Sequence, residues 1–155
     1  MNVTHSHKAG ELFASGYNCA QAVFGAFSDV TGIDETVAFR LSSSFGGGMG
    51  RMREVCGAVS GAFMVIGVLY GYSEHEDKAK SELYSTVREF ADRFREENGS
   101  IICRELLAGA GVQKDTSNEP EKRTAEYYKK RPCREYVEMA AQILDEMIAR
   151  KGLPV

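Results

Sequence analysis

The chain has 155 residues, 43% hydrophobic and 26% charged, which is ordinary for a soluble globular protein and predicts one domain over residues 1–155. A net charge of −3, with no basic stripe carrying interleaved aromatics, argues against nucleic acid as a partner. The first residues show no basic-then-apolar signal pattern, so we expect a cytoplasmic protein whose cysteines stay reduced.

The first third of the chain carries three helical patterns. Residues 5–15 form a short amphipathic helix pattern that ends at Gly16. Residues 18–29 form a second pattern. Asp34 is a typical N-cap residue and predicts a third short helix that reaches Leu41.

The longest apolar segment, residues 56–72, contains no charged residue and follows a glycine-rich stretch at 45–50. Its length is at the lower limit for a membrane span. It also holds four glycines and a serine, and no second such segment follows. We therefore expect no membrane span. The segment reads as a central helix, buried on all sides, with Gly57 and Gly61 spaced for close helix packing.

The second half is also helical. Residues 74–97 predict a long charged amphipathic helix, residues 102–107 a short one and residues 132–150 a last one, whereas the polar residues 113–123 predict a loop. The expected fold is all-α, a single-domain helical bundle around a central apolar helix of about residues 55–71. That helix could pack in a homodimer as readily as in a monomer.

The four cysteines each fall in the predicted first turn of a helix. They are Cys19, Cys56, Cys103 and Cys133. Asn18, Ser100 and Pro132 supply helix-start signals before three of them, and the glycine-rich stretch precedes the fourth. A helix start presents N–H groups and partial positive charge, which stabilise a thiolate and lower its pKa. We therefore expect several helix starts to converge on one sulfur site.

The cysteine spacing leaves three functions open. The chain has no C-x-x-C and no C-x-x-C-H, so a zinc ribbon, a thioredoxin-like dithiol and covalently attached haem are not expected. Four convergent thiolates could hold an iron–sulfur cluster or, alternatively, zinc, for electron transfer or redox sensing. Without metal they could act as redox thiols of a thiol–disulfide oxidoreductase with an unknown partner protein. A third alternative is a non-catalytic binding or scaffold protein whose cysteines are core residues.

Arginines and glycines accompany the cysteines along the chain. The nearby arginines are Arg51, Arg53, Arg104, Arg131 and Arg134, which would offset the charge of a thiolate group or lie solvated on the surface. The N–H groups of Gly47, Gly48 and Gly50, together with Arg53, could form a cofactor-binding nest, or the glycines could serve close packing. His5 and His7 are more typical of a helix start than of a surface metal site.

The hexapeptide Cys56-Gly57-Ala58-Val59-Ser60-Gly61 matches a C-G-A-x-x-G signature, and the other three cysteines follow in the expected order. In this the chain resembles the C_GCAxxG_C_C family, which has a suspected redox role, over nearly its full length. The family is similar to the non-haem part of split-Soret cytochromes, where an iron–sulfur centre is associated with such a domain. The resemblance implies an all-helical fold and makes the four cysteines candidate cluster ligands or redox thiols.

Overall fold

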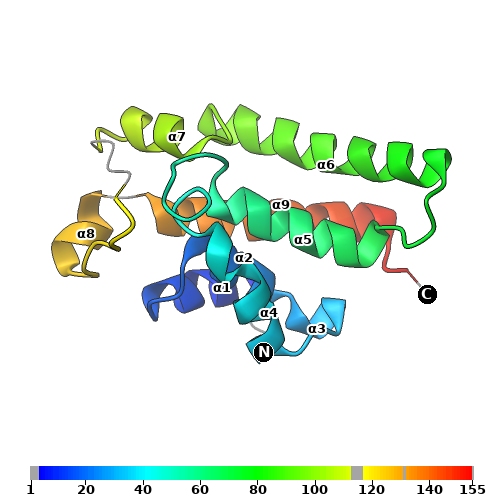
Figure 1. Ribbon diagram of the computed structural model, residues 1–155, viewed down its shortest axis with the longest axis horizontal. Helices are drawn as coiled ribbons and strands as arrows, with labels where there is room; N and C mark the ends of the chain where they lie inside the picture. Colours follow the sequence, from blue (N-terminus) through cyan, green and yellow to red (C-terminus); the bar gives the residue numbers. More distant parts are fainter. Residues whose placement is uncertain (1–3, 113–116, 131, 155) are drawn as a thin grey trace.

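The computed structural model describes residues 4–112, 117–130 and 132–154 (Figure 1). The helices are α1 (His5–Ala14), α2 (Cys19–Ala26), α3 (Ser28–Thr31), α4 (Glu35–Ser42), the 3-10 turn η1 (Ser43–Phe45), α5 (Gly57–Tyr70), α6 (Asp77–Asn98), α7 (Cys103–Gly109), α8 (Ala125–Lys130) and α9 (Cys133–Lys151). An isolated antiparallel bridge joins Val55 to Ile102, and the described residues form no strand. The all-α prediction is confirmed.

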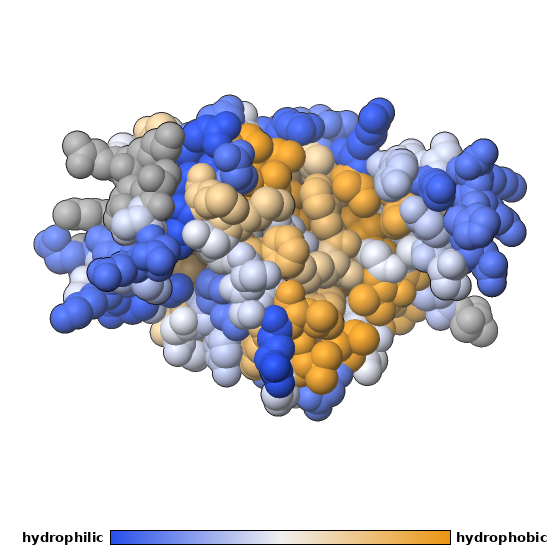
Figure 2. Space-filling model, in the orientation of Figure 1, coloured by the Kyte–Doolittle hydropathy of each residue, from blue (hydrophilic) through white to orange (hydrophobic). Residues whose placement is uncertain are grey.

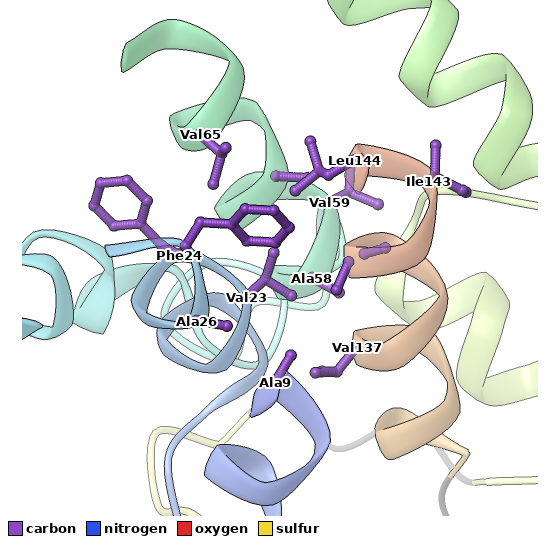
Figure 3. Close-up of a cluster of buried hydrophobic side chains, with 14 of the residues drawn as sticks. Ala9, Val23, Phe24, Ala26, Ala58, Val59, Val65, Val137, Ile143 and Leu144 are labelled. Carbon is purple, nitrogen blue, oxygen red and sulfur yellow. The ribbon is translucent and has the colours of Figure 1, made fainter. Parts of the chain in front are cut away.

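The helices pack in layers around α5 and α9, which lie side by side in the middle of Figure 1. α6 covers one side of this pair and contacts both helices, while α1 and α2 cover the other side. The core lies between these layers (Figure 3), where Phe24 of α2, Val59 and Val65 of α5, and Leu144 of α9 are almost completely buried. Burying each such side chain contributes about 2 kcal/mol.

The observed helix ends agree with the predicted ones at some positions and differ at others. Asp34 accepts hydrogen bonds from the N–H groups of Thr36 and Val37, so it caps α4 as predicted. The helix predicted over residues 18–29 is interrupted at Phe27, whose backbone leaves helical geometry between α2 and α3. The helix α8 was not predicted, because its six residues carry no apolar period.

The close packing expected for α5 is present along α2. A Cβ atom on Gly61 would lie 2.7 Å from the carbonyl oxygen of Ala20, and one on Gly57 would lie 3.0 Å from the nitrogen of Ala20. Both contacts are with backbone, which cannot move aside without shifting a helix. The absence of side chains at these glycines therefore sets the distance between α2 and α5 and positions the start of each helix.

We expect Gly61→Ala to lower the free energy of unfolding by about 2 kcal/mol, because overpacking against Ala20 outweighs the gain in helix propensity. Gly67 lies on the same helix, and a Cβ there would meet nothing within 4 Å. Gly67→Ala should therefore raise stability by about 1 kcal/mol. Urea unfolding of the two variants checks the pair, and a similar change in both would contradict the packing role.

One face of α5 is not covered by the rest of the chain, so the expectation of a helix buried on all sides is wrong. Val68 is 42% exposed, and Figure 2 shows apolar side chains gathered over the region where Figure 1 draws α5 and α4. Val37 and Leu41 of α4 are also exposed.

No helix within the described residues is long and apolar enough to cross a membrane.

His5 begins α1, as expected, and ties three helices together. Its ring lies 2.7 Å from a carboxylate oxygen of Asp145 in α9 and 2.9 Å from Asp29 in α3, and it stacks on Phe27 at 4.1 Å. The hydrogen bond with Asp145 raises the pKa of His5 above its ordinary value of 6.5, although burial acts in the opposite direction. The charged imidazolium therefore stabilises the fold.

We expect this stabilisation to be fully present below about pH 6.5 and to be lost as the pH rises through the raised pKa of folded His5. Its size should be about 1 kcal/mol, because Asp29 is exposed and water screens that partner. Thermal unfolding of the parent and of His5→Gln at pH 5.5 and pH 8.5 measures it. A stability difference between them that does not shrink with pH would contradict the assignment.

Candidate functional site

Each of the four cysteines lies at the start of a helix, as predicted. Cys19, Cys103 and Cys133 are the first residues of α2, α7 and α9, and Cys56 is the N-cap of α5. Asn18 closes a capping box with Gln21.

Two of the expected start signals act differently from the prediction. Ile102, not Ser100, is the N-cap of α7, because the Ser100 hydroxyl accepts a hydrogen bond from the N–H group of Ile102 at 2.9 Å. Pro132 occupies the N-cap of α9 rather than its first helical position.

All four cysteines line one cavity of about 60 Å³, although they are distributed from position 19 to position 133. Cys56 and Cys103 are buried, whereas Cys19 and Cys133 are partly buried. The cavity is large enough for a few water-sized groups. The expected convergence of the helix starts is therefore found in the fold.

The backbone joins two of the helix starts directly. At the bridge between Val55 and Ile102, the Cys56 N–H donates to the carbonyl of Ile101 at 2.8 Å. The Cys103 N–H donates to the carbonyl of Glu54 at 2.6 Å. Cys56 and Cys103 are thus held in a fixed relation by hydrogen bonds that do not depend on their sulfur atoms.

A left-handed turn leads from the glycine-rich stretch to Cys56 (residues 46–53, hereafter the glycine loop), and Figure 1 draws it as a ring beside the start of α5. The residues with positive φ are Gly47, Gly48, Met49, Gly50, Arg51 and Arg53. At Gly48 a Cβ would lie 2.7 Å from the Cβ of Cys103 and 2.8 Å from the Cα of Arg53. Only glycine lets the loop approach Cys103 this closely.

The N–H groups of the glycine loop mostly serve the loop itself. Those of Met49 to Glu54 all donate to backbone carbonyls of residues 44–49, with distances from 2.8 to 3.2 Å. Gly47, Gly48 and Arg53 line the cysteine cavity. Gly50 instead lines a second pocket, which lies between the glycine loop and residues 118–123. These contacts favour a packing role for the loop, and its part in binding a cofactor stays a prediction.

Two thiols of the site, those of Cys19 and Cys56, have raised pKa values, in contrast to the lowered values expected at helix starts. The hydrogen bond with Cys133 raises the pKa of Cys19 most, followed by burial and the charges of the other cysteines. Burial raises the pKa of Cys56 to about 12, although the N–H groups of Ala58 and Val59 act in the opposite direction. Loss of hydration therefore outweighs the helix dipole, and these two sulfurs are protonated at neutral pH.

Of the arginines named from the sequence, Arg53 reaches a cysteine. Arg53 is only 4% exposed, and its guanidinium donates to the sulfur of Cys103 at 3.7 Å. Arg104 pairs with Glu54 at 3.1 Å, and Arg134 pairs with Glu11 and Glu138 on the surface. Arg131 lies outside the described residues.

Sequence reasoning missed Arg123 and Tyr127, which also line the cysteine cavity. Arg123 lies 4.4 Å from the ring centre of Phe13 and donates to the carbonyls of Phe13 and Tyr17, each at 3.2 Å. The predicted loop of residues 113–123 had no apolar signal, and residues 113–116 lie outside the described part. A single arginine in a polar stretch gives no local sign that it packs inward.

The sulfurs share a cavity but do not meet at one point. In the parts of the chain that the structure describes, no three His, Cys, Asp or Glu side chains are grouped closely enough to hold a single metal ion. The described cysteines are thiols rather than disulfides. A hydrogen bond joins the side chains of Cys19 and Cys133.

A family model described as "Putative redox-active protein (C_GCAxxG_C_C)" matches residues 17–147, which include all four cysteines. No curated protein and no solved structure gives a significant match.

Proposed function

We propose that the four cysteines bind an iron–sulfur cluster. The premise is that this chain belongs to the C_GCAxxG_C_C family, whose model matches residues 17–147. The observation that carries the proposal is the convergence of Cys19, Cys56, Cys103 and Cys133 on one small cavity. Four cysteine thiolates are the usual ligand set of both [2Fe–2S] and [4Fe–4S] clusters. When bound, such a cluster would supply one-electron transfer, for an electron-transfer or redox-sensing role with a partner protein.

The residues around the cavity fit a cluster better than a single zinc ion. Zinc needs four ligands within about 2.3 Å of one point, and the described side chains form no such group. The irons of a cluster are bridged by sulfide, so its cysteines need not converge as tightly. Zinc would require the cysteine side chains to move closer together, and it stays the alternative metal.

The protein environment would control the charge of the site. The cysteines lose their protons on binding metal, which costs more here because the pKa values of Cys19 and Cys56 are raised. Buried Arg53, beside Cys103, offsets the negative charge of the thiolates. Burial of Cys56 and Cys103 limits the access of water and oxidants to their sulfurs.

The hydrogen bond between Cys19 and Cys133 favours a second candidate, a thiol–disulfide oxidoreductase without metal. The two thiols would form one S–S bond and release two protons and two electrons. The electrons would reduce a disulfide of a partner protein, which takes up two protons and becomes two thiols. Cys56 and Cys103 would then have no direct part in the exchange.

An absorption spectrum from 300 to 600 nm of protein purified without oxygen tests the first proposal, together with assays of iron and sulfide. A broad visible band that dithionite bleaches, with matching iron and sulfide, is expected. A colourless protein that loses two thiols on mild oxidation and yields a linked Cys19–Cys133 peptide would support the second candidate. A colourless protein that loses no thiols would contradict both.

A further inference from the structure

Arg123 lies at the cysteine cavity and is held there by uncharged groups. Its guanidinium donates to the backbone carbonyls of Phe13 and Tyr17, each at 3.2 Å. It also donates to the hydroxyl of Tyr128 at 3.5 Å, and these three are its polar partners within the described part of the chain. Other arginines instead pair with carboxylates, among them Arg93, Arg104, Arg134 and Arg150.

Aromatic rings surround the same guanidinium. Its central carbon lies 4.4 Å from the ring centre of Phe13 and 4.9 Å from that of Tyr127. Both rings line the cysteine cavity together with Arg123, so the guanidinium lies at the cavity wall. A ring face attracts a cation but carries no net charge that would cancel it. Arginine also keeps its charge in proteins, so Arg123 brings a fixed positive charge to this wall.

The contacts of Arg123 place this charge near two of the cysteines. Tyr17, whose carbonyl it binds, lies two residues before Cys19. The helix α8 carries two of the surrounding rings, and Figure 1 draws it at the end of the molecule where α9 begins with Cys133. The shared cavity of about 60 Å³ is only a few ångströms across. A charge on its wall therefore acts on the sulfurs over a short path with little intervening water.

We propose that Arg123 stabilises negative charge at the cysteine site, on the sulfurs or on a cluster that they bind. A cluster is more negative when reduced, so a nearby cation raises its reduction potential. In a metal-free protein, the same charge favours the approach of anionic reactants to Cys19 and Cys133. The redox meaning of this charge rests on the proposed function, whereas its effect at the sulfurs does not depend on metal.

The competing explanation is that Arg123 only fastens α8 to the end of α1. Phe13 lies in the last turn of α1, and basic side chains are common at the C-terminal ends of helices. Tyr128 supports the same attachment, because its hydroxyl lies 3.4 Å from the carbonyl of Ala14. A purely structural role predicts that any loosening of α8 alters the site. A role of the charge predicts that only its removal does.

The test compares Arg123→Gln, which removes the charge, with Arg123→Lys, which keeps it. Tyr128→Phe is the first control, because it weakens the attachment of α8 without changing the charge. Arg150→Gln is the second control. It removes an equal charge near the far end of α9, about 26 Å from Cys133 by the helical rise. Circular dichroism and thermal unfolding establish that each variant is folded.

The spectrum of the anaerobically purified protein decides which quantity is measured. For a coloured protein it is the midpoint potential of the cluster. Arg123→Gln should lower this potential by about 30 to 60 mV, which is a three- to tenfold change converted at about 59 mV per factor of ten for one electron.

For a colourless protein, the quantity is the ratio of the alkylation rates of Cys19 and Cys133 with iodoacetate and with iodoacetamide, at low ionic strength. The same thiolate displaces iodide from both reagents, so differences in the amount of thiolate cancel in the ratio. Iodoacetate is an anion and iodoacetamide is neutral, so the ratio reports the charge around the sulfur. Arg123→Gln should lower it about three- to tenfold.

The expected result is a decrease in Arg123→Gln that is absent from Arg123→Lys and from both controls. An unchanged value in Arg123→Gln, or an equal decrease in Arg123→Lys, Tyr128→Phe or Arg150→Gln, would overturn the inference. The outcome is separable from that of the cluster proposal. A colourless protein with a decreased ratio supports this inference and removes the cluster, and a coloured protein with an unchanged potential does the reverse.

Discussion

Replacing Cys56 by serine is expected to reduce bound iron more than tenfold while the helical fold remains. A serine hydroxyl is a far poorer ligand for iron in a cluster than a thiolate is. Serine is, however, a preferred N-cap residue, and residue 56 is the N-cap of α5. The N–H groups of Ala58 and Val59, at the start of this helix, lower the pKa of the Cys56 thiol and so lie within reach of its side chain. Serine at this position could accept a hydrogen bond there, so stability should fall by less than about 1 kcal/mol.

Cys56→Ala is the matched control for this variant. Alanine removes the ligand and also offers no cap, so it should lose as much iron as serine but be less stable by about 1 kcal/mol. Iron per folded chain and thermal unfolding of both proteins give the comparison. Equal losses of folding in the two variants, with normal iron content in the folded fraction, would mean that Cys56 is a core residue and not a ligand.

Gly48→Ala is expected to lower stability by about 3 kcal/mol and to disturb the cysteine site. The new Cβ would lie 2.7 Å from the Cβ of Cys103 and 2.8 Å from two backbone atoms, and Gly48 has a φ of 72°. Left-handed backbone costs an alanine about 1 kcal/mol, and the overlap adds about 2 kcal/mol more. Because the overlap is with Cys103 itself, the variant should also lose iron or redox activity.

Gly50→Ala isolates the backbone term. Gly50 has a φ of 57°, but a Cβ there would meet nothing within 4 Å. We therefore expect a loss of about 1 kcal/mol and an intact cysteine site. Urea unfolding and the visible spectrum of both variants check the pair. If Gly50→Ala disturbed the site as much as Gly48→Ala, the close approach to Cys103 would not be the reason for the glycine.

The helix starts of the site could be predicted because their signals are local. Asn18 is a strong N-cap, and the apolar segment after Cys56 is unmistakably helical. The joint placement of four cysteines at such starts then indicated a shared site, and in the structure all four line one cavity. What sequence did not supply is the bridge at Val55 and Ile102, which pairs two segments far apart in the chain.

Burial explains where the sequence-based interpretation of the site failed. The pKa of Cys56 was expected to fall at a helix start, but it is raised because the residue is enclosed by the core. The inward position of Arg123 could not be predicted either, because it depends on contacts with Phe13 and Tyr17, more than a hundred residues earlier in the chain. Met49 and Arg51 have positive φ, which no residue preference predicts for side chains of this kind.

The position of Cys133 at the start of α9 has a consequence for the timing of biosynthesis. The other three cysteines leave the ribosome first, yet α9 packs against α1, α2, α5 and α6, so the core closes only after α9 has been made. Contacts between such distant segments form late in folding. The cavity that the four cysteines share can therefore form only in a chain whose synthesis has passed α9.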